Sequence, residues 1–267
     1  MSDFLNDMAH LSEQRAAALS ITSAQLDRPL VPLRLQRFDL IAEIKGRSPS
    51  EGTLNDNERN RVAQATAYIE GGAAAISVLT EPSRFAGELS HLDEISSIAA
   101  QFRVPTMRKD FLTAPSQIVE GRAAGASGVL LIAAMLDDKL LRSMLDCAWE
   151  HGMFVLLEAF DDADLARMSA LLESAEIADK AAGYLLLMGV NTRNLRTLEV
   201  DAQRLRKLAP LLPAGVRCVA ESGLKVPADA AAAMRGGYQL GLVGTALMRS
   251  AEPQQLVADM LAAGREQ

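Results

Sequence analysis

The stretch FDLIAEIKGRSPSEG, residues 38–52, starts as an apolar segment and ends in charged and small residues. Its first part has the composition of a buried β-strand, and Glu43 and Lys45 stand two positions apart where that strand runs out. Side chains two apart in a strand share a face. We therefore expect a strand that points a carboxylate and an ammonium group inward together, followed by a serine-containing turn.

Further apolar runs of this kind follow, with helical patterns between them. The eight runs span residues 38–44, 74–80, 104–110, 128–135, 153–160, 184–190, 217–222 and 240–244. Their starts lie roughly 24 to 36 residues apart, which is one strand, one helix and their two loops. Strands that are apolar along their whole length need cover on both faces, as in a parallel sheet inside a helical shell. Eight such units predict a closed (β/α)8 barrel, the TIM-barrel fold.

An open, doubly wound sheet is the main alternative fold. It is disfavoured because no glycine-rich G-x-G-x-x-G turn follows the first strand. Helix signals fit the barrel units: Pro115 stands where a first helical turn tolerates proline, and Gly125 stands where the following helix must stop. Ser90 and Asp93 predict a capping box for the helix after the second strand.

The first 35 residues precede the first strand. They are expected to be helical through Ala18 and then extended through DRPLVPLR, residues 27–34. We interpret residues 1–35 as an N-terminal extension that covers one end of the barrel. The whole chain, residues 1–267, is then a single domain.

Composition narrows the classes of partner. Of 267 residues, 49% are hydrophobic and 23% are charged, and the net charge of -7 argues against a nucleic-acid or anionic-membrane partner. Small anionic substrates remain compatible with it. Residues 1–20 lack the basic start and apolar centre of a secretion signal, and the longest apolar run, residues 129–136, is too short to span a bilayer. These observations predict a cytoplasmic protein.

The two cysteines form no disulfide framework and fit a reducing compartment. Cys147 and His151 lie four apart on a predicted helix, which is the spacing of paired metal ligands. No second Cys/His pair accompanies them, and Cys147 lies on an apolar stripe beside Ala148 and Trp149. We predict core packing for these residues and no metal site.

Charged and polar side chains gather at the carboxyl ends of the predicted strands, where barrel enzymes place their reacting groups. They are Glu43 and Lys45, Lys109 and Asp110, Glu158, Asn191 and Arg193, and Glu221 and Ser222. Salt-bridged plugs inside the barrel are the structural alternative. So many ions converging at one end favour a functional site, because desolvating them without a use is costly.

Glycines follow the last two strands. In ESGL (221–224) and LVGTALM (242–248), Gly223 and Gly244 leave backbone N–H groups open to an anion, and Thr245 starts a short helix. The loops after strands seven and eight form the usual phosphate site of this barrel. Turn formation is the alternative for each glycine alone, whereas their joint position predicts a phosphate site.

Several motifs, in this order, resemble the indole-3-glycerol phosphate synthase family. They are EIK (43–45), RKDF (108–111), GVNTRNL (189–195), ESG (221–223) and LVGT (242–245), within residues 38–250. The resemblance implies a carboxy-lyase of tryptophan biosynthesis that needs no cofactor. Its reaction closes the ring of 1-(2-carboxyphenylamino)-1-deoxyribulose 5-phosphate, with loss of CO2 and water, to give indole-3-glycerol phosphate.

The resemblance also implies a role for each matching residue. Lys109 is the general acid that protonates the substrate carbonyl, Glu158 is the acid or base of the dehydration, and Glu43 lies close to the same hydroxyl. Lys45 neutralises the phosphate and helps to orient the acid. The other residues implied to bind substrate are Ser48, Phe85, Phe111, Asn191, Arg193, Leu195, Glu221, Ser222 and Leu242, with Gly223, Gly244 and Thr245 at the phosphate.

Protonation of a ketone oxygen favours an acid whose pKa lies near neutrality. Lys109 is crowded by a second cation and partly buried in this interpretation. Both effects lower the pKa of a lysine. We therefore expect a lowered pKa for Lys109.

Two other functions stay open. A related phosphate-binding barrel, such as phosphoribosylanthranilate isomerase, would use a Cys and an Asp as its acid and base, where this chain has Glu43 and Lys109. A catalytically silent or substrate-shifted paralogue that binds a phosphorylated ligand is the other alternative. Intact Lys109 and Glu158 argue against silence.

The chain departs from the family pattern in three places: Gly87-Glu88, Phe160, and the order of residues within KGRSPS (45–50). These departures bear on substrate affinity more than on reaction type. The resemblance also raises association with other tryptophan-pathway enzymes as an expectation.

Overall fold

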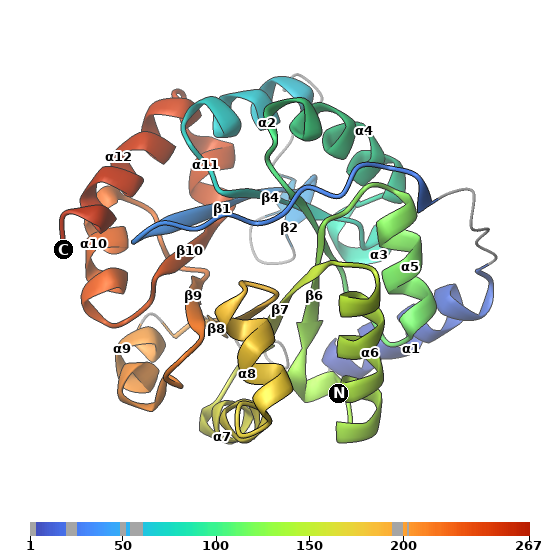
Figure 1. Cartoon of the computed structure of the whole chain (residues 1–267). Helices are drawn as coiled ribbons and strands as arrows, with labels where there is room; N and C mark the ends of the chain where they lie inside the picture. Colours follow the sequence, from blue (N-terminus) through green and yellow to red (C-terminus); the bar gives the residue numbers. More distant parts are fainter. Residues whose placement is uncertain (1–3, 20–25, 49–51, 54–60, 194–199, 202) are drawn as a thin grey trace.

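Eight parallel strands close into a barrel (Figure 1). The computed structural model describes residues 4–19, 26–48, 52–53, 61–193, 200–201 and 203–267. Around the barrel the order is β1-β10-β9-β8-β7-β6-β5-β4, and the first and last of these strands pair with each other. The strands are β1 (Asp39–Ile44), β4 (Ala75–Leu79), β5 (Thr106–Lys109), β6 (Gly128–Ile132), β7 (Phe154–Ala159), β8 (Leu186–Asn191), β9 (Arg217–Glu221) and β10 (Leu240–Val243). This confirms the predicted (β/α)8 barrel, and each strand lies within its predicted run except β8, which ends one residue later, at Asn191.

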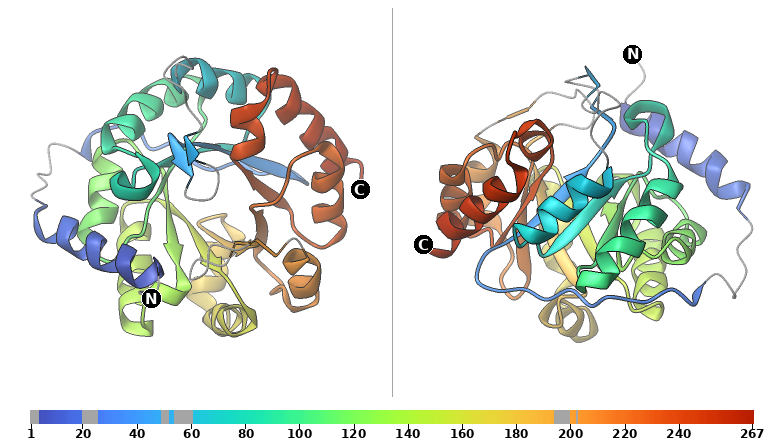
Figure 2. Two further views of the ribbon diagram at one scale, coloured as in Figure 1. Left: turned by 180° about the vertical axis from the view of Figure 1, so that it is seen from behind. Right: turned by 90° about the horizontal axis from the view of Figure 1, so that it is seen from above.

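Helices surround the barrel on the outside (Figures 1 and 2). They are α2 (Arg61–Glu70), α4 (Leu89–Ala99), α5 (Pro115–Ala123), α6 (Asp138–Glu150), α7 (Asp162–Leu171), α8 (Ala175–Ala182), α9 (Arg204–Leu208), α10 (Pro227–Arg235) and α12 (Pro253–Arg265). Shorter elements follow strand ends: α3 (Pro82–Phe85), α11 (Thr245–Arg249), η3 (Ala133–Met135), and the antiparallel pair β2 (Arg47–Ser48) and β3 (Gly52–Thr53). Two others, η2 (Ala100–Phe102) and η4 (Ala209–Leu211), continue α4 and α9. No described helix has the length and apolar character that a membrane crossing requires.

The strand alternation divides the core into two layers. Leu40, Ala42 and Ile44 of β1 pack outward in the cluster that includes the helices. Ile41 instead belongs to the cluster inside the barrel, and Glu43 lies on that same inward face. Most of the buried apolar side chains belong to the outward layer. Charged side chains can therefore occupy the carboxyl end of the barrel interior. The predicted inward direction of Glu43 is therefore confirmed.

The N-terminal helix α1 (Phe4–Ala17) packs against the ends of β5 and the loop after it. The Arg15 guanidinium contacts Asp110 at 2.7 Å, and the Gln117 amide donates to Ser12 Oγ at 2.8 Å. The chain then crosses to the opposite end of the barrel, where the Val31 backbone N–H donates to Ser127 Oγ (Figure 2). The extension therefore covers part of the strand-end mouth, as expected.

The helix signals are confirmed in part. Pro115 is the first residue of α5, and Gly125 follows it with a φ of 90°. The capping box at Ser90 is wrong, because α4 begins one residue earlier, at Leu89. Ser90 Oγ instead donates to the Glu88 carboxylate, and Glu88 occupies the N-cap position without a side-chain cap.

Candidate active site

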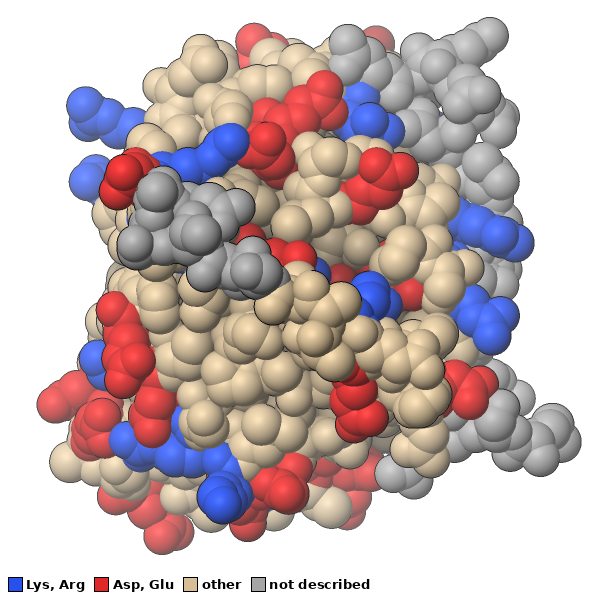
Figure 3. Space-filling view, turned by 90° about the vertical axis from the view of Figure 1, so that its right-hand side faces the viewer, with Lys and Arg blue, Asp and Glu red and all other residues tan. Residues whose placement is uncertain are grey.

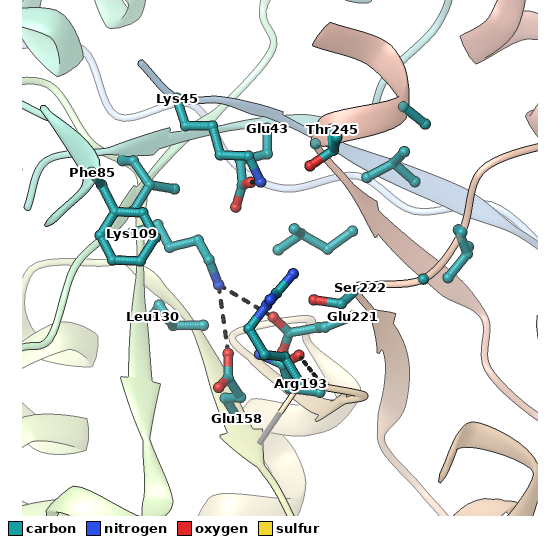
Figure 4. Close-up of a pocket in the computed structure, with 18 of the residues that line it drawn as sticks. Glu43, Lys45, Phe85, Lys109, Leu130, Glu158, Arg193, Glu221, Ser222 and Thr245 are labelled. Atoms are coloured by element: carbon teal, nitrogen blue, oxygen red, sulfur yellow. Dashed lines mark hydrogen bonds and ion pairs between the residues drawn. The ribbon is translucent and has the colours of Figure 1, made fainter. Parts of the chain in front are cut away.

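A cavity of about 560 Å³ opens at the carboxyl ends of the strands. Charged side chains from separate strands point into it (Figure 4). They are Glu43 and Lys45 at the end of β1, Lys109 of β5, Glu158 of β7, Arg193 after β8 and Glu221 of β9. The prediction that these side chains meet at one end of the barrel is confirmed.

The first ion pair joins Glu43, on β1, to Lys45, directly after it. Lys45 Nζ lies 2.6 Å from Glu43 Oε1, and both side chains are largely buried. Burial alone would raise the pKa of Glu43, but Lys45 and then Lys109 lower it below its ordinary value. Glu43 is therefore a carboxylate at neutral pH.

The second ion cluster is centred on Lys109. Its Nζ lies 3.5 Å from Glu158 Oε2 and 3.4 Å from Glu221 Oε2. Burial would lower the pKa of Lys109, but the carboxylates of Glu221, Glu158 and Glu43 outweigh burial and raise it above its ordinary value. The expected lowering of this pKa is wrong, because the negative neighbours outnumber the one nearby lysine. Lys109 holds its proton at neutral pH.

The pKa of Glu221 is shifted in the opposite direction from that of Glu43. Burial and the nearby charge of Glu158 raise its pKa well above the ordinary value, and Lys109 compensates only partly. Among the described residues, neither Glu158 Oε1 nor Glu221 Oε1 has a hydrogen-bond partner. Protonation of Glu221 would relieve the repulsion between the two carboxyl groups.

Glu221→Gln should raise the stability of the fold at neutral pH. The pKa of Glu221 is above 4.5 when folded and ordinary when unfolded, so the folded chain binds more protons and loses stability as pH rises through 4.5. A neutral amide removes that loss. We expect a higher midpoint of thermal unfolding at pH 8, by about 2–4 °C per kcal/mol, and no gain at pH 4. Glu150→Gln, on an exposed position of α6, is the control. An equal change at both pH values would contradict the raised pKa.

Residues beside Lys109 hold the end of β5 in place. Asp110 accepts hydrogen bonds from Thr80 Oγ1 at 2.8 Å and from Arg15 at 2.7 Å. Arg108 lies on the outward face and pairs with Glu120 at 2.7 Å. Asp110 was predicted only as one more charge at a strand end. The network makes it the anchor that joins this strand end to α1.

Aromatic and aliphatic side chains form one wall of the cavity. Phe85, Phe111 and Leu242 line it as the resemblance implied. Phe4 of α1 also lines it, with its ring centroid 5.9 Å from that of Phe111 in an edge-to-face arrangement. Sequence reasoning missed Phe4, because no strand-end signal marks a residue in the extension. Leu130 and Ile132 of β6 were missed for a different reason, since they look like ordinary strand residues.

The remaining predicted residues divide into two groups. Asn191, Arg193 and Ser222 line the cavity, and so do Gly223, Gly244 and Thr245. Two cations that sequence reasoning missed, Lys225 and Arg249, line the cavity beside these glycines. The Ser48 side chain and all of Leu195 lie outside the described residues.

Two of the three family departures, at Phe160 and at Gly87-Glu88, are not among the residues that line the cavity. The third, KGRSPS (45–50), begins at Lys45 in the cavity and ends outside the described residues. The Phe160 ring lies 3.7 Å from the guanidinium carbon of Arg204. At Gly87, a Cβ would lie 2.5 Å from the Leu79 carbonyl oxygen, so this turn requires glycine. Glu88 is exposed.

Cys147 and His151, which have the spacing of paired metal ligands, contact backbone carbonyl oxygens instead. His151 Nδ1 lies 2.8 Å from the Cys147 carbonyl oxygen. Cys147 Sγ donates to the Pro115 carbonyl oxygen, and burial raises the pKa of this thiol. Among the described residues, no group of three or more His, Cys, Asp or Glu side chains could hold a metal ion. Packing within the helical layer is what the structure supports for Cys147.

The cavity lies at the carboxyl ends of the strands, where (β/α)8-barrel enzymes have their active sites. The fold and the site therefore define a (β/α)8-barrel enzyme. A sequence model described as indole-3-glycerol phosphate synthase matches residues 8–260. The indole-3-glycerol phosphate synthase of Parafrankia sp. (strain EAN1pec) is 43% identical over 235 residues, which are 88% of this chain and 82% of that protein. The protein of the same name from Mycobacterium leprae (strain Br4923) is 42% identical over 255 residues, 95% of this chain and 87% of that one. The chain belongs to the indole-3-glycerol phosphate synthase family.

Solved structures with low sequence identity share the fold. 3-Hexulose-6-phosphate synthase from Salmonella typhimurium superposes with a TM-score of 0.63 at 14% identity, over 86% of this chain and 99% of that one. Phosphoribosyl anthranilate isomerase in complex with reduced 1-(o-carboxyphenylamino)-1-deoxyribulose 5-phosphate gives 0.57 at 13% identity, over 86% and 100%. At these identities the likeness supports the barrel alone.

Proposed function

We propose that the cavity carries out the reaction of its family, the conversion of 1-(2-carboxyphenylamino)-1-deoxyribulose 5-phosphate to indole-3-glycerol phosphate in tryptophan biosynthesis. The observation that carries this proposal is Lys109, held at 3.4 and 3.5 Å from two buried carboxyl groups inside a cavity with an apolar wall. The reaction is a carboxy-lyase reaction that these acid and base groups can perform alone.

Lys109 is the general acid in the proposed first step. As the aromatic carbon bonds to the carbonyl carbon, charge develops on the carbonyl oxygen, which becomes a stronger base than an amine. A lysine with a raised pKa is fully protonated at neutral pH, so the proton is in place whenever the substrate binds. CO2 then leaves the same aromatic carbon, and the bonding electrons restore the ring.

Glu158 serves the second half, the loss of water. The hydroxyl formed in the first step leaves as water after protonation, and a base removes the proton that completes the new double bond. The Glu158 side chain lines the cavity, and its buried Oε1 has no hydrogen-bond partner among the described residues. Glu43 lies in the same mouth, with its charge balanced by Lys45.

The two ends of the substrate match the two sides of the cavity. The aromatic ring fits the wall formed by Phe85, Phe111 and Leu242. The phosphate fits the opposite side, where the bare backbone of Gly223 and Gly244 and the start of α11 at Thr245 lie with Lys45. Affinity then comes from the phosphate and orientation from the wall.

Lys45→Ala should weaken substrate binding more than it slows turnover. A charge-assisted contact to phosphate contributes about 1.5–3 kcal/mol, so we expect KM to rise by about 10- to 100-fold. Steady-state kinetics and inhibition by inorganic phosphate measure this, and the inhibition should weaken in parallel. Lys139→Ala, an exposed position of α6, should change neither. A large fall in kcat with KM and phosphate inhibition unchanged would remove Lys45 from the phosphate site.

A silent or substrate-shifted paralogue is the alternative. An assay that follows indole fluorescence after addition of the carboxyphenylamino substrate tests the proposed reaction directly. Formation of the indole product supports it. Absence of product, with phosphate-dependent binding retained, would favour the paralogue.

The cellular location and the partners of the protein are proposed from less specific observations than its reaction. The family acts on a small phosphorylated substrate. We place the protein in the cytoplasm, because both cysteines are unpaired and Cys218 is buried. On the face shown in Figure 3, acidic and basic side chains are mixed, which fits the prediction that nucleic acid is not a partner. Association with other tryptophan-pathway enzymes stays a prediction.

A further inference from the structure

Gly189 lies on β8 beneath the carboxyl group of a neighbouring strand. It pairs with Glu158 of β7 on one side and with Val219 of β9 on the other. A Cβ built on Gly189 would lie only 1.9 Å from Glu221 Oε1 and 3.1 Å from a methyl carbon of Leu156. The Glu221 carboxyl therefore lies directly against the bare Cα of Gly189.

The backbone of Gly189 does not itself demand glycine. Its φ is outside the left-handed region, unlike that of Gly223, so an alanine could adopt the same conformation. Close approach of another group is the remaining reason for a glycine inside a strand. That group is a buried carboxyl of the cavity.

We propose that Gly189 is a positioning residue, which leaves room for the Glu221 carboxyl to lie over β8 towards Glu158, where its other oxygen is near Lys109. This inference rests on the proposed role of Lys109. β8 lies between β9, which carries Glu221, and β7, which carries Glu158, so the Glu221 carboxyl approaches Glu158 over the strand that carries Gly189. Its Oε2 lies 3.4 Å from Lys109 Nζ, which comes from β5 on the far side of the barrel. A methyl group on Gly189 would fill the position of Glu221 Oε1 and push the carboxyl into the cavity.

A second carboxyl group of the cavity, that of Glu43, also lies against a glycine. A Cβ on Gly244 would lie 2.3 Å from Glu43 Oε1 and 2.9 Å from Lys45 Nζ. Each of the two ammonium groups thus has a carboxyl that lies against a glycine. Gly244 also faces the proposed phosphate site, so Gly189 is the position where the effect on a carboxyl can be tested alone.

Displacement of Glu221 should change the titration of the cluster. The groups that face it are Glu158 on β7 and Lys109 on β5, with Glu43 acting on Lys109 from β1. In its present position, burial and the charge of nearby Glu158 raise the pKa of Glu221 and favour its protonated form. Moved toward the open cavity, Glu221 would lose its proton at lower pH.

Gly189→Ala tests the proposal. We expect kcat to fall by about 10- to 100-fold, the loss that a small misplacement of a reacting group produces. KM should change little, and the limb of the kcat–pH profile set by the carboxyl pair should move to lower pH. Gly183→Ala is the matched control, because a Cβ there meets nothing closer than 3.4 Å and lies at the end of α8.

A double-mutant cycle with Glu221→Ala separates the contact from a general effect on the strand. With the Glu221 side chain gone, Gly189→Ala should have almost no further effect on kcat or on the midpoint of thermal unfolding. Multiplicative effects on kcat, or an unchanged pH profile in Gly189→Ala, would overturn the proposal. If Gly189→Ala unfolds, Glu221→Ala should restore its unfolding midpoint; failure to restore it would place the clash at Leu156 and also overturn the proposal. The unfolding cycle does not depend on the role of Lys109, so failure of the proposed function would be recognised separately through Lys109 itself.

Discussion

Replacing Lys109 by alanine should lower kcat by about 10²- to 10⁴-fold, the contribution of a positioned general acid. The reason is that Lys109 is the one described lysine inside the carboxyl cluster, at 3.5 Å from Glu158 and 3.4 Å from Glu221. The ion-pair partners of its ammonium group are Glu158 and Glu221, and neither belongs to the apolar wall or to the residues assigned to the phosphate. Binding of inorganic phosphate should therefore persist. Single-turnover formation of the indole product measures the chemical step.

Lys109→Ala should also change the thermal unfolding midpoint in a way that depends on pH. Because its pKa is raised, Lys109 stabilises the fold at every pH below 10.5 and loses this effect as pH rises further. Its removal leaves Glu158 and Glu221 without their shared counter-charge. We expect a lower unfolding midpoint at pH 8 and a smaller deficit at pH 5, where carboxyl groups take up protons more easily. Lys139→Ala should show neither effect, and near-full turnover by Lys109→Ala would refute the acid assignment.

Glu158→Gln should reduce kcat by a comparable factor of about 10² or more, because an amide can neither give nor take the proton of the dehydration step. The shape of the side chain is kept, so KM should change little. If the two halves of the reaction are separate, an intermediate that has lost CO2 but not water should accumulate. Mass spectrometry of quenched reactions would detect it.

Glu158→Gln should also change the pH dependence of what activity remains. The charge of Glu158 is one cause of the raised pKa of Glu221. Without that charge the pKa of Glu221 falls, so the corresponding limb of the pH profile should move to lower pH. Glu173→Gln, on an exposed position, is the control. Full activity with an unchanged profile would exclude Glu158 from both roles.

The barrel and the position of its site could be predicted from sequence, because both follow from local patterns. Each strand is an apolar run bounded by polar residues, and a parallel barrel brings all carboxyl ends to one rim. Once the fold is known, Glu43, Lys109 and Glu158 have to meet. Their direction follows from the two-residue period of a strand.

The properties that depend on distance across the barrel could not be predicted in this way. The pKa of Lys109 is set by carboxyl groups from three other strands, and sequence reasoning counted the nearby lysine but not this excess of negative charge. Phe4 reaches the cavity only because Arg15 and Asp110, 95 positions apart in sequence, fix α1 there. Gly189 looked like part of a motif, and its contact with Glu221 appears only when β8 and β9 lie side by side.

The pairing of β1 with β10 constrains how the molecule can be made by a ribosome. Asp39 of β1 accepts a hydrogen bond from Arg265, 226 positions later in the chain. At about 5–20 residues per second, roughly 10 to 45 s pass between the synthesis of these two residues. During that interval one edge of β1 stays unpaired and open to other nascent chains. A premature stop codon before Leu240 would make this exposure permanent, and we expect such a product to go to chaperones and proteases.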